Sequence, residues 1–427
     1  MKAATLESKF PILAVEHDCI ISKDADITIA YKVELPELFT VTRNEYEAIH
    51  SAWAKAVKVL PNYSIVHRQD WFIEENYTPD IQRDDLSFLS RSFERHFNER
   101  PYLRHTSYLF LTKTTKERSR TQSNFTALTR NFIIPKEMQD KDTVTRFLES
   151  CDQFERIIND SGFVRITRMR KDEITGTENS AGIIEKYFSL SQQETTCLQD
   201  LTLGAAEMKV GDNCLCLHTL SDTDDLPGKV ATDMRYERLS TDRSDCRLSF
   251  AAPIGVLLTC NHIVNQYLFI DPAENLKKFE KQARNMHSLS RYSRSNQINR
   301  EWIEEYLNEA HSLGLTSVRA HCNVLAWSDE RNRLKQIKND VGSQLALMEC
   351  KPRHNTVDTP TLFWAAIPGN AGDFPFEESY YTFIEQALCF FIGESCSRDS
   401  LSPFGIRMVD RLTGKPVHLD ISDLPMR

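Results

Sequence analysis

The sequence lacks a run of apolar residues long enough to cross a bilayer as a helix. Its most apolar stretch, residues 250–260, contains Pro253 and Gly255 and is shorter than the roughly 20 residues that a membrane-spanning helix needs. A signal-peptide pattern is also absent, because the short apolar run at 10–15 is followed directly by charged residues. We therefore expect any association with a membrane to be peripheral or through partners.

The sequence also has no excess of basic residues. Its 427 residues include 52 lysines and arginines against 61 aspartates and glutamates, a net charge of -9. A dedicated nucleic-acid-binding protein is more often basic, so direct DNA binding is not expected. The 11 cysteines are odd in number and irregularly spaced, which indicates free thiols in a reducing cytosol, not a disulfide framework.

No nucleotide-binding loop of the form Gly-x-x-x-x-Gly-Lys-Ser/Thr and no Walker B motif is present. The Gly-Lys pairs at 228–229 and 414–415 lack the upstream glycine and the following hydroxyl, and we interpret both as turns. Without the loop amides, the lysine and the hydroxyl, nothing holds the β- and γ-phosphates of ATP. We therefore expect no catalytic residue, cofactor or metal in this chain, and ATP with magnesium only in a further domain.

One group of metal-ligating residues alternates along the chain. Cys214, Cys216 and His218 would lie on one face of a strand. A zinc site needs a fourth ligand or an open position, and the neighbouring sequence supplies no CxxC or HxxxH partner. Core thiols beside an unrelated histidine are the ordinary interpretation, and a zinc-dependent cytosolic hydrolase is the alternative.

Two further pairs bring a thiol and an imidazole close in sequence. They are Cys260 with His262 and His321 with Cys322, which suit a thiol nucleophile and its base. Neighbours on a strand point to opposite faces, however, so His321 is badly placed to serve Cys322. The sequence contains no HExxH or GxSxG motif. A thiol-dependent hydrolase is kept as an alternative to a non-catalytic role.

Helical and strand periodicities alternate along the chain and predict an α+β fold of two lobes. In the first lobe, residues 1–260, strands at 27–33 and 63–73 flank a helix that begins at a capping box of Thr42 and Glu45. An apolar stripe predicts another helix over 144–158, and Ser191 with Glu194 forms a second capping box. Residues 201–252 lose the helical period and are expected to be β-rich or a long inserted loop.

The second lobe, residues 261–400, is predicted to alternate strands and helices, an order compatible with a ferredoxin-like arrangement. Residues 401–427 contain two short apolar runs around a Thr-Gly-Lys-Pro turn, which predict a β-hairpin and a linker. The expected strands are 266–270, 317–327 and 362–367, and the expected helices are 275–300 with a break near 288–295, then 299–313, 328–348 and 376–391.

Basic residues concentrate in one region of the second lobe. A solvated helix face is the ordinary interpretation of such a run, followed by contact with an acidic partner or anionic lipid headgroups. DNA contact comes last, because no series of aromatic residues interleaves with the charges. The residues are Lys277, Lys278, Lys281, Arg284, Arg291, Arg294 and Arg300.

Several blocks of the sequence resemble the TraG family of conjugative-transposon proteins, which are relatives of the largest ATPase of type IV secretion machines. Residues 367–370 match a Pro-Gly-Asn element of the wider secretion-ATPase family, formed here by Pro368, Gly369 and Asn370. The other similar blocks are 7–16, 90–102, 239–250, 349–356 and 418–426.

The resemblance implies a cytoplasmic ATPase, peripheral at the bacterial inner membrane, that supports DNA transfer through a conjugation channel. In that family the N-terminal half docks on inner-membrane channel subunits and helps to set the oligomer, a hexamer, with the Pro-Gly-Asn element as a candidate subunit contact. A segment like 418–426 leads there to a Walker A loop and a RecA-like ATPase domain, and this sequence ends before it.

We therefore predict that the chain is the non-catalytic docking and oligomerisation region of a TraG-type ATPase. A DNA-binding conjugation accessory protein is a further alternative.

Overall fold

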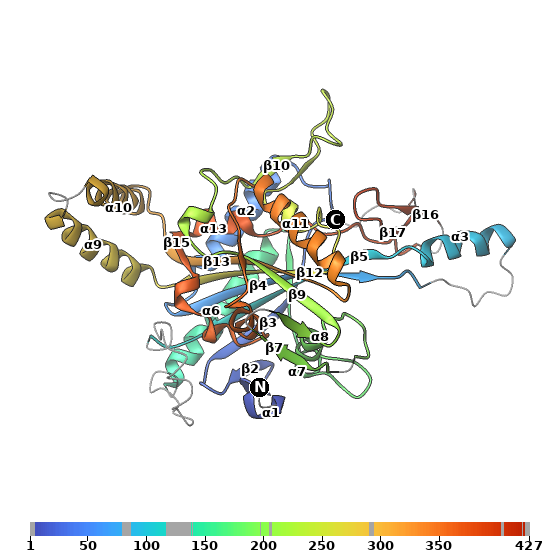
Figure 1. The fold of residues 1–427 in the computed structure, drawn as a ribbon, viewed down its shortest axis with the longest axis horizontal. Coiled ribbons are helices and arrows are strands. Elements are labelled where there is room, and N and C mark those ends of the chain that lie inside the picture. Colours follow the sequence, from blue (N-terminus) through green and yellow to red (C-terminus); the bar gives the residue numbers. More distant parts are fainter. Residues whose placement is uncertain are drawn as a thin grey trace.

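The computed structural model describes residues 5–78, 87–116, 138, 140–196, 198–204, 207–289, 294–402, 405–420 and 422. One large antiparallel sheet forms the body of the molecule, and helical arms extend from it at both ends (Figure 1). The sheet follows the order β1-β2-β3-β5-β4-β12-β13-β9-β8-β7, with β6 paired to β3, β14 to β9 and β15 to β13. The α+β class predicted from the sequence is confirmed.

The strands are spread over most of the chain. The sheet strands are β1 (Ile12–Glu16), β2 (Cys19–Ser22), β3 (Ile27–Glu34), β4 (Ser64–Glu75), β5 (Tyr102–Lys113), β6 (Arg165–Arg168), β7 (Leu201–Leu203), β8 (Met208–Val210), β9 (Asn213–Leu220), β12 (His262–Ile270), β13 (Ser317–Ser328), β14 (Arg353–Asn355) and β15 (Tyr380–Phe383). Two separate hairpins are formed by β10 (Asp233–Arg235) with β11 (Arg247–Ser249), and by β16 (Ile406–Val409) with β17 (Pro416–Leu419).

The sheet continues across the border that the sequence placed at residue 260. β12 pairs with β4 along its whole length, from His262 opposite Phe72 to Ile270 opposite Ser64. β13 then pairs with β9 from the 201–252 segment, which is β-rich as expected. Among the described residues, the second half therefore forms no separate ferredoxin-like sheet, because β12, β13 and β14 each pair with a strand of the first half.

Both faces of the sheet are buried, as the alternation along its central strands shows. On β4, Val66 faces one apolar core and Ile65 the other. On β13, Val324 faces the same core as Val66, and Leu325 faces the same core as Ile65. Such two-sided burial explains why these strands have nearly continuous buried runs and not a polar face.

Helices cover the two faces as outer layers. The first core, which contains Val66, takes side chains from four helices: α2 (Arg43–Lys58), α6 (Lys141–Asp160), α11 (Arg331–Leu347) and α13 (Ile384–Ala387). The second core, which contains Ile65, takes side chains from α8 (Ile183–Ser189), α12 (Thr359–Ala365) and Ile174 of α7 (Lys171–Thr175). In the first core, the ring of Trp53 lies 6.0 Å from that of Phe154 and 5.4 Å from that of Phe391. Aromatic contacts of this kind add to the free energy gained by burial.

Several predicted elements are confirmed. The capping box before α2 is formed, with the Thr42 amide donating to Glu45 Oε2 at 2.7 Å. Helices at 144–158 and 328–348 and strands at 27–33, 63–73, 266–270 and 317–327 correspond to α6, α11, β3, β4, β12 and β13. The terminal hairpin is present as β16 and β17, with Ile406 opposite Leu419 and Val409 opposite Pro416.

Three predicted elements are wrong. Residues 362–367 belong largely to α12, because Pro360 in the first turn favours a helix start. Residues 376–391 form β15 and α13 between short 3-10 turns, since Tyr380–Phe383 hydrogen-bonds to the β13 edge. No helix begins at Ser191, where the Glu194 carbonyl accepts a hydrogen bond from the Ala181 amide and folds the segment back along the start of α8.

The arms are helical. One consists of α9 (Pro272–Leu289) and α10 (Arg294–Ser312). α9 is the first part of the helix expected at 275–300, and α10 joins its second part to the helix that was expected separately at 299–313. At the opposite end of the longest axis lies α3 (Phe88–Asn98), near the β16–β17 hairpin (Figure 1). Among the described helices, which also include α1 (Leu6–Lys9), none is long and apolar enough to span a membrane.

Candidate interaction site

The α9–α10 arm is attached to the sheet by a cluster of aromatic rings. Phe279 of α9 lies 4.8 Å from Tyr306 of α10 and 4.9 Å from Tyr381 of β15, measured between ring centroids. Tyr306 stacks on Phe383 at 4.5 Å, and its hydroxyl donates to the Ser317 hydroxyl at 2.8 Å. The base of the arm is therefore fixed by packing and a hydrogen bond, while the remainder extends from the body.

The basic residues predicted for this region have two different environments. Lys277, Lys281 and Arg284 are exposed and recur at the spacing of one helical face on α9. Lys278 is also exposed, but it donates to the Tyr381 hydroxyl at 2.8 Å and lies over the rings of Phe376 and Tyr381 at 5.3 and 4.7 Å. We therefore define the cationic stripe of α9 as Lys277, Lys281 and Arg284, with Lys278 anchoring the helix.

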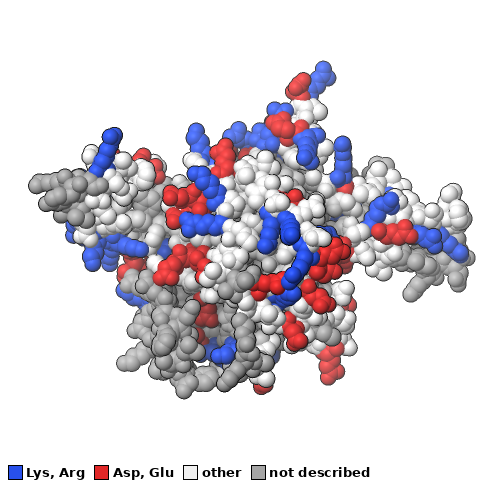
Figure 2. Space-filling model, in the orientation of Figure 1, with Lys and Arg blue, Asp and Glu red and all other residues white. Residues whose placement is uncertain are grey.

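The predicted basic set also includes three arginines, Arg291, Arg294 and Arg300. Arg294 is exposed at the start of α10, Arg300 pairs with Glu304 at 2.6 Å, and Arg291 lies outside the described residues. Figure 2 shows blue lysine and arginine side chains along the lower edge of this arm. Its positive charge is thus concentrated on α9 and at the start of α10.

The Pro-Gly-Asn turn lies inside the molecule. Pro368, Gly369 and Asn370 are all buried, and the Asn370 side chain donates to the Trp364 carbonyl at 2.9 Å. Gly369 has a φ of 89°, and a Cβ atom there would lie 2.5 Å from Cγ2 of Ile20. In the described structure this turn therefore supports the β1–β2 hairpin from within.

The three residues considered for zinc lie on β9, as the alternation predicted. Cys214, Cys216 and His218 are buried, and burial raises the pKa of Cys216 to about 11 and lowers that of His218 to about 4. His218 has His354 as a neighbour, with ring centroids 5.3 Å apart. Within the described ranges, no three His, Cys, Asp or Glu residues gather closely enough to hold a metal ion.

The two thiol–imidazole pairs are engaged in internal contacts. Both ring nitrogens of His262 face backbone carbonyls, those of Cys260 at 2.8 Å and Ile254 at 3.1 Å. His321 contacts the Glu378 carbonyl at 2.5 Å, while Cys322 packs into the first core. Burial raises the pKa of Cys260 to about 12 and shifts that of Cys322 upward too, so neither thiol is prepared to form a thiolate.

A buried ionic cluster was missed in the sequence interpretation. Arg68 and Asp70, both fully buried on β4, are joined by a 3.0 Å contact, and His105 lies 3.1 Å from Asp70. Arg68 also donates to the Ile392 carbonyl at 2.6 Å and lies over the rings of Trp53 and Phe391. Burial would raise the pKa of Asp70, but Arg68 and His105 hold it below its usual value.

Glu394 extends this cluster toward α2. Its carboxylate accepts hydrogen bonds at 3.0 Å from the Tyr46 hydroxyl and from the Ser249 amide and hydroxyl. Burial raises the pKa of Glu394 to about 7, against the opposing effect of these donors and of Arg68. The sequence pattern that could have indicated such a cluster is the polar run of residues 67–70 inside an otherwise apolar strand.

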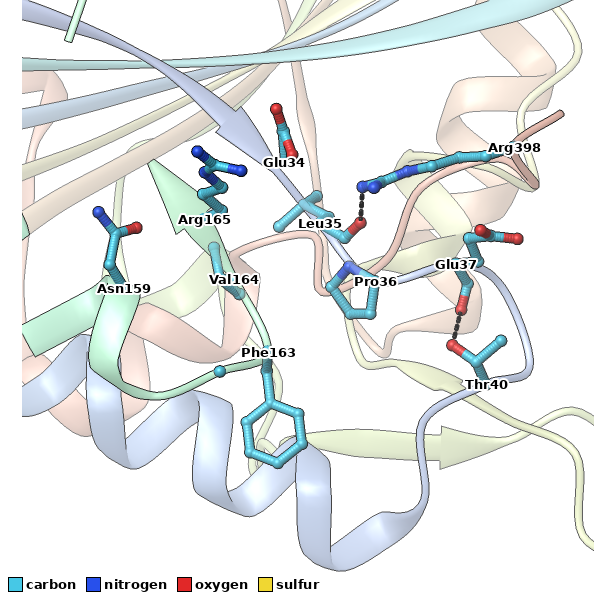
Figure 3. Close-up of a pocket in the computed structure, with 11 residues that line it drawn as sticks. Glu34, Leu35, Pro36, Glu37, Thr40, Asn159, Phe163, Val164, Arg165 and Arg398 are labelled. Atoms are coloured by element: carbon cyan, nitrogen blue, oxygen red, sulfur yellow. Dashed lines mark hydrogen bonds between the residues drawn. The ribbon is translucent and has the colours of Figure 1, made fainter. Parts of the chain in front are cut away.

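A pocket of about 600 Å³ lies between the chain after β3, the turn after α6 and Arg398 (Figure 3). Arg398 already donates to the Leu35 carbonyl at 2.8 Å, and the Thr40 hydroxyl donates to the Glu37 carbonyl at 2.7 Å. Its charged side chains are of both signs, since Glu34 and Arg165 are cross-strand partners. Arg398 and Thr40 are thus hydrogen-bonded within the chain, and the mixed charges of the lining point to no particular ligand.

Residues 1–51 match a known protein family. Its description reads "Domain of unknown function, B. Theta Gene description (DUF3875)". The matched segment contains β1, β2, β3 and the first turns of α2, so the buried Pro-Gly-Asn turn packs against it. A comparison with curated proteins gives no match.

Proposed function

We propose that this chain is the docking and oligomerisation region of a TraG-type conjugation ATPase, acting at the cytoplasmic face of the bacterial inner membrane. The observation that carries the docking role is the cationic stripe of α9, which stands on an arm anchored to the sheet but extending from it. An exposed positive stripe on a rigid helix attracts an acidic partner surface and guides its approach. The partners are the inner-membrane subunits of the conjugation channel.

Two further observations support this proposal. Sequence blocks that resemble the TraG family occur from the first residues to the last, and the N-terminal segment matches a family described from a B. Theta gene. The thiols proposed for a hydrolase are buried with raised pKa values, which is unsuited to a nucleophile that must reach a substrate. A role through surfaces explains these features better than catalysis by Cys and His.

A pull-down tests the proposal. The chain, carrying an affinity tag, is mixed with detergent-solubilised small membrane subunits of the channel, and the full-length ATPase serves as the comparison. We expect this chain alone to retain the subunits. Retention by the full-length protein but not by this chain would contradict the docking role. The proposal also expects no binding of ATP at micromolar concentration to this chain, which isothermal titration measures.

A further inference from the structure

The two ends of the molecule carry helical surfaces with no described partner in the chain. α3 lies at one end of the longest axis, and α10 lies on the arm at the other end (Figure 1). These helices are too far apart to meet within one chain, because the whole sheet lies between them. Each is therefore available to another molecule.

The exposed face of α3 is aromatic and basic. Phe88 is 84% exposed, and Leu89 and Phe93 are also exposed. Arg91 and Arg95 follow one another at i and i+4, so they lie on one side of the helix beside Phe88. Large apolar side chains at this exposure are costly in water and mark a contact surface when they gather with charges.

The base of α3 is held firmly, so this face has a fixed orientation. Glu94 pairs with Arg407 of β16 at 2.8 Å, and both side chains are largely buried. Arg407 also lies 4.3 Å from the ring of Tyr77, and Phe97 is buried beside that ring at 6.2 Å. A rigid presentation lowers the entropy lost on binding.

The exposed face of α10 is aromatic and acidic. Trp302 is 66% exposed, and Ile298 lies one turn before it on the same face. Glu301 and Glu305 flank Trp302 and are exposed, again at i and i+4. The opposite side of α10 is buried through Ile303, which leaves the acidic face directed away from the arm.

We infer that α3 of one copy docks on α10 of the next copy, so that this chain assembles head to tail. This inference rests on the oligomerisation role proposed above and identifies its surfaces. The spacing of Arg91 and Arg95 equals that of Glu301 and Glu305, so two helices lying side by side in the same direction can pair Arg91 with Glu301 and Arg95 with Glu305. This alignment brings Phe88 level with Ile298, one turn from Trp302. Two different surfaces in contact form a heterologous interface, which closes into a ring or continues as a filament.

The existing contacts of these residues do not prevent docking. Arg95 lies 3.8 Å from Glu99, but both side chains are mostly exposed, and such pairs contribute little stability. Glu301 accepts a hydrogen bond from Gln297 at 3.1 Å on the same helix. A second copy is favoured over a lipid surface because the acidic face of α10 complements α3 and would be repelled by anionic headgroups.

Sedimentation of charge-reversed variants tests this inference. Arg91→Glu with Arg95→Glu gives α3 an acidic face, so that α3 and α10 both carry negative charge and repel each other. Glu301→Arg with Glu305→Arg gives α10 a basic face, so that both helices carry positive charge. We expect the wild-type chain to form assemblies above its 49.3 kDa mass, and each double variant to associate at least about tenfold more weakly. An equimolar mixture of the two variants should reassemble, because every α3 again meets an α10 of opposite charge.

Tryptophan emission supplies a second measurement. Trp302 is exposed, while the other four tryptophans are buried or half-buried, so acrylamide mainly quenches Trp302. Quenching should fall when the wild-type chain assembles, and Trp302→Phe should abolish this change. Circular dichroism of each variant checks folding, which exposed substitutions leave intact.

Three results would overturn the inference: a wild-type chain that stays monomeric, variants that assemble as the wild type does, or a mixture that fails to reassemble. Binding of the chain to vesicles of anionic lipid, lost with Arg91→Glu and Arg95→Glu and without assembly in solution, would also overturn it. Retention of the channel subunits by a monomeric chain would refute this contact while leaving the docking role intact.

Discussion

Glu394 is completely buried, and its carboxyl group accepts hydrogen bonds from three donor groups on two other segments, the Tyr46 hydroxyl and the Ser249 amide and hydroxyl. Its pKa rises from 4.5 to about 7, mainly because burial disfavours the charged form. A carboxyl with a higher pKa in the folded state binds its proton more tightly when folded. The stability contributed by this proton is therefore present below about pH 4.5 and is lost as the pH rises through 7.

Replacing Glu394 by Gln should remove this dependence. At pH 5 the variant and the wild type should have similar stability, because the wild-type carboxyl is protonated. At pH 8 the variant should be more stable relative to the wild type by roughly 3 kcal/mol, since the amide carries no charge. Urea unfolding at pH 5, 6, 7 and 8 measures the difference.

The buried histidines do not interfere with that comparison. Burial lowers the pKa of His67 and His321 to about 3 and that of His262 to about 4. Their neutral forms are favoured by folding, so they reduce stability as the pH falls below 6.5 in both proteins alike. A stability difference between wild type and variant that is constant from pH 5 to 8 would show that Glu394 has an ordinary pKa.

Gly369 should be intolerant of a side chain. Its φ of 89° is unfavourable for other residues, and a Cβ atom would meet Ile20 at 2.5 Å. We expect Gly369→Ala to lower the free energy of unfolding by about 1–3 kcal/mol, measured by urea unfolding. The matched control is Gly342→Ala in α11, where nothing lies within 4 Å and stability should rise by about 0.5–1 kcal/mol. Equal effects at the two positions would contradict the packing described for the turn.

Some of these residue-scale features could be predicted from the sequence. Pro368 and Gly369 predicted a tight turn, and the positive φ of Gly369 confirms it. The neighbour that the glycine packs against, Ile20, lies far away in sequence and could not be predicted from the motif. Arg68 and Asp70 were read only as part of a strand, because their pairing depends on burial of both sheet faces.

At the scale of elements, the helical spacing of apolar residues predicted helices correctly where it continued over several turns. The stripes of α2, α6 and α11 each span several turns, and those helices are confirmed. Short apolar runs were ambiguous between strand and helix, and residues 362–367 form a helix where a strand was predicted. In 376–391 the helical spacing was accidental, since β13 offers an edge that Tyr380–Phe383 completes as a strand.

The arms illustrate the same limit. The break near 288–295 and the Lys and Arg composition of α9 were visible in the sequence, but the separation of Lys278 from the cationic stripe was not. Tyr381 and Phe376, which hold Lys278, are contributed by residues about a hundred positions later. Amphipathic spacing gives a helix its faces, whereas tertiary contacts decide which exposed charges are already engaged within the chain.

At the scale of the whole molecule, the order of the strands could not be predicted from the sequence. β4 pairs with β12, and β9 enters the sheet between β13 and β8. Pairing between strands so distant in sequence leaves no pattern in either strand. The sequence of each strand indicates only that both of its faces are buried, not which strand lies beside it. The alternation of helical and strand patterns was enough to predict the α+β class, while the described residues form no separate ferredoxin-like sheet.

The measurement that tests the central claim most directly is the affinity of this chain for the solubilised membrane subunits of the channel. Wild type is compared with Lys277→Glu plus Lys281→Glu on the cationic stripe of α9. The control, Lys55→Glu plus Lys335→Glu, makes the same charge change at exposed positions on α2 and α11. Biolayer interferometry at two salt concentrations gives the dissociation constants.

A docking role through α9 predicts tight binding of wild type and control, weaker binding at higher salt, and at least about a tenfold loss in the α9 variant. The opposite result is equally clear. If the subunits do not bind the wild-type chain, or bind the α9 variant as tightly as the control, the cationic stripe is not a docking surface.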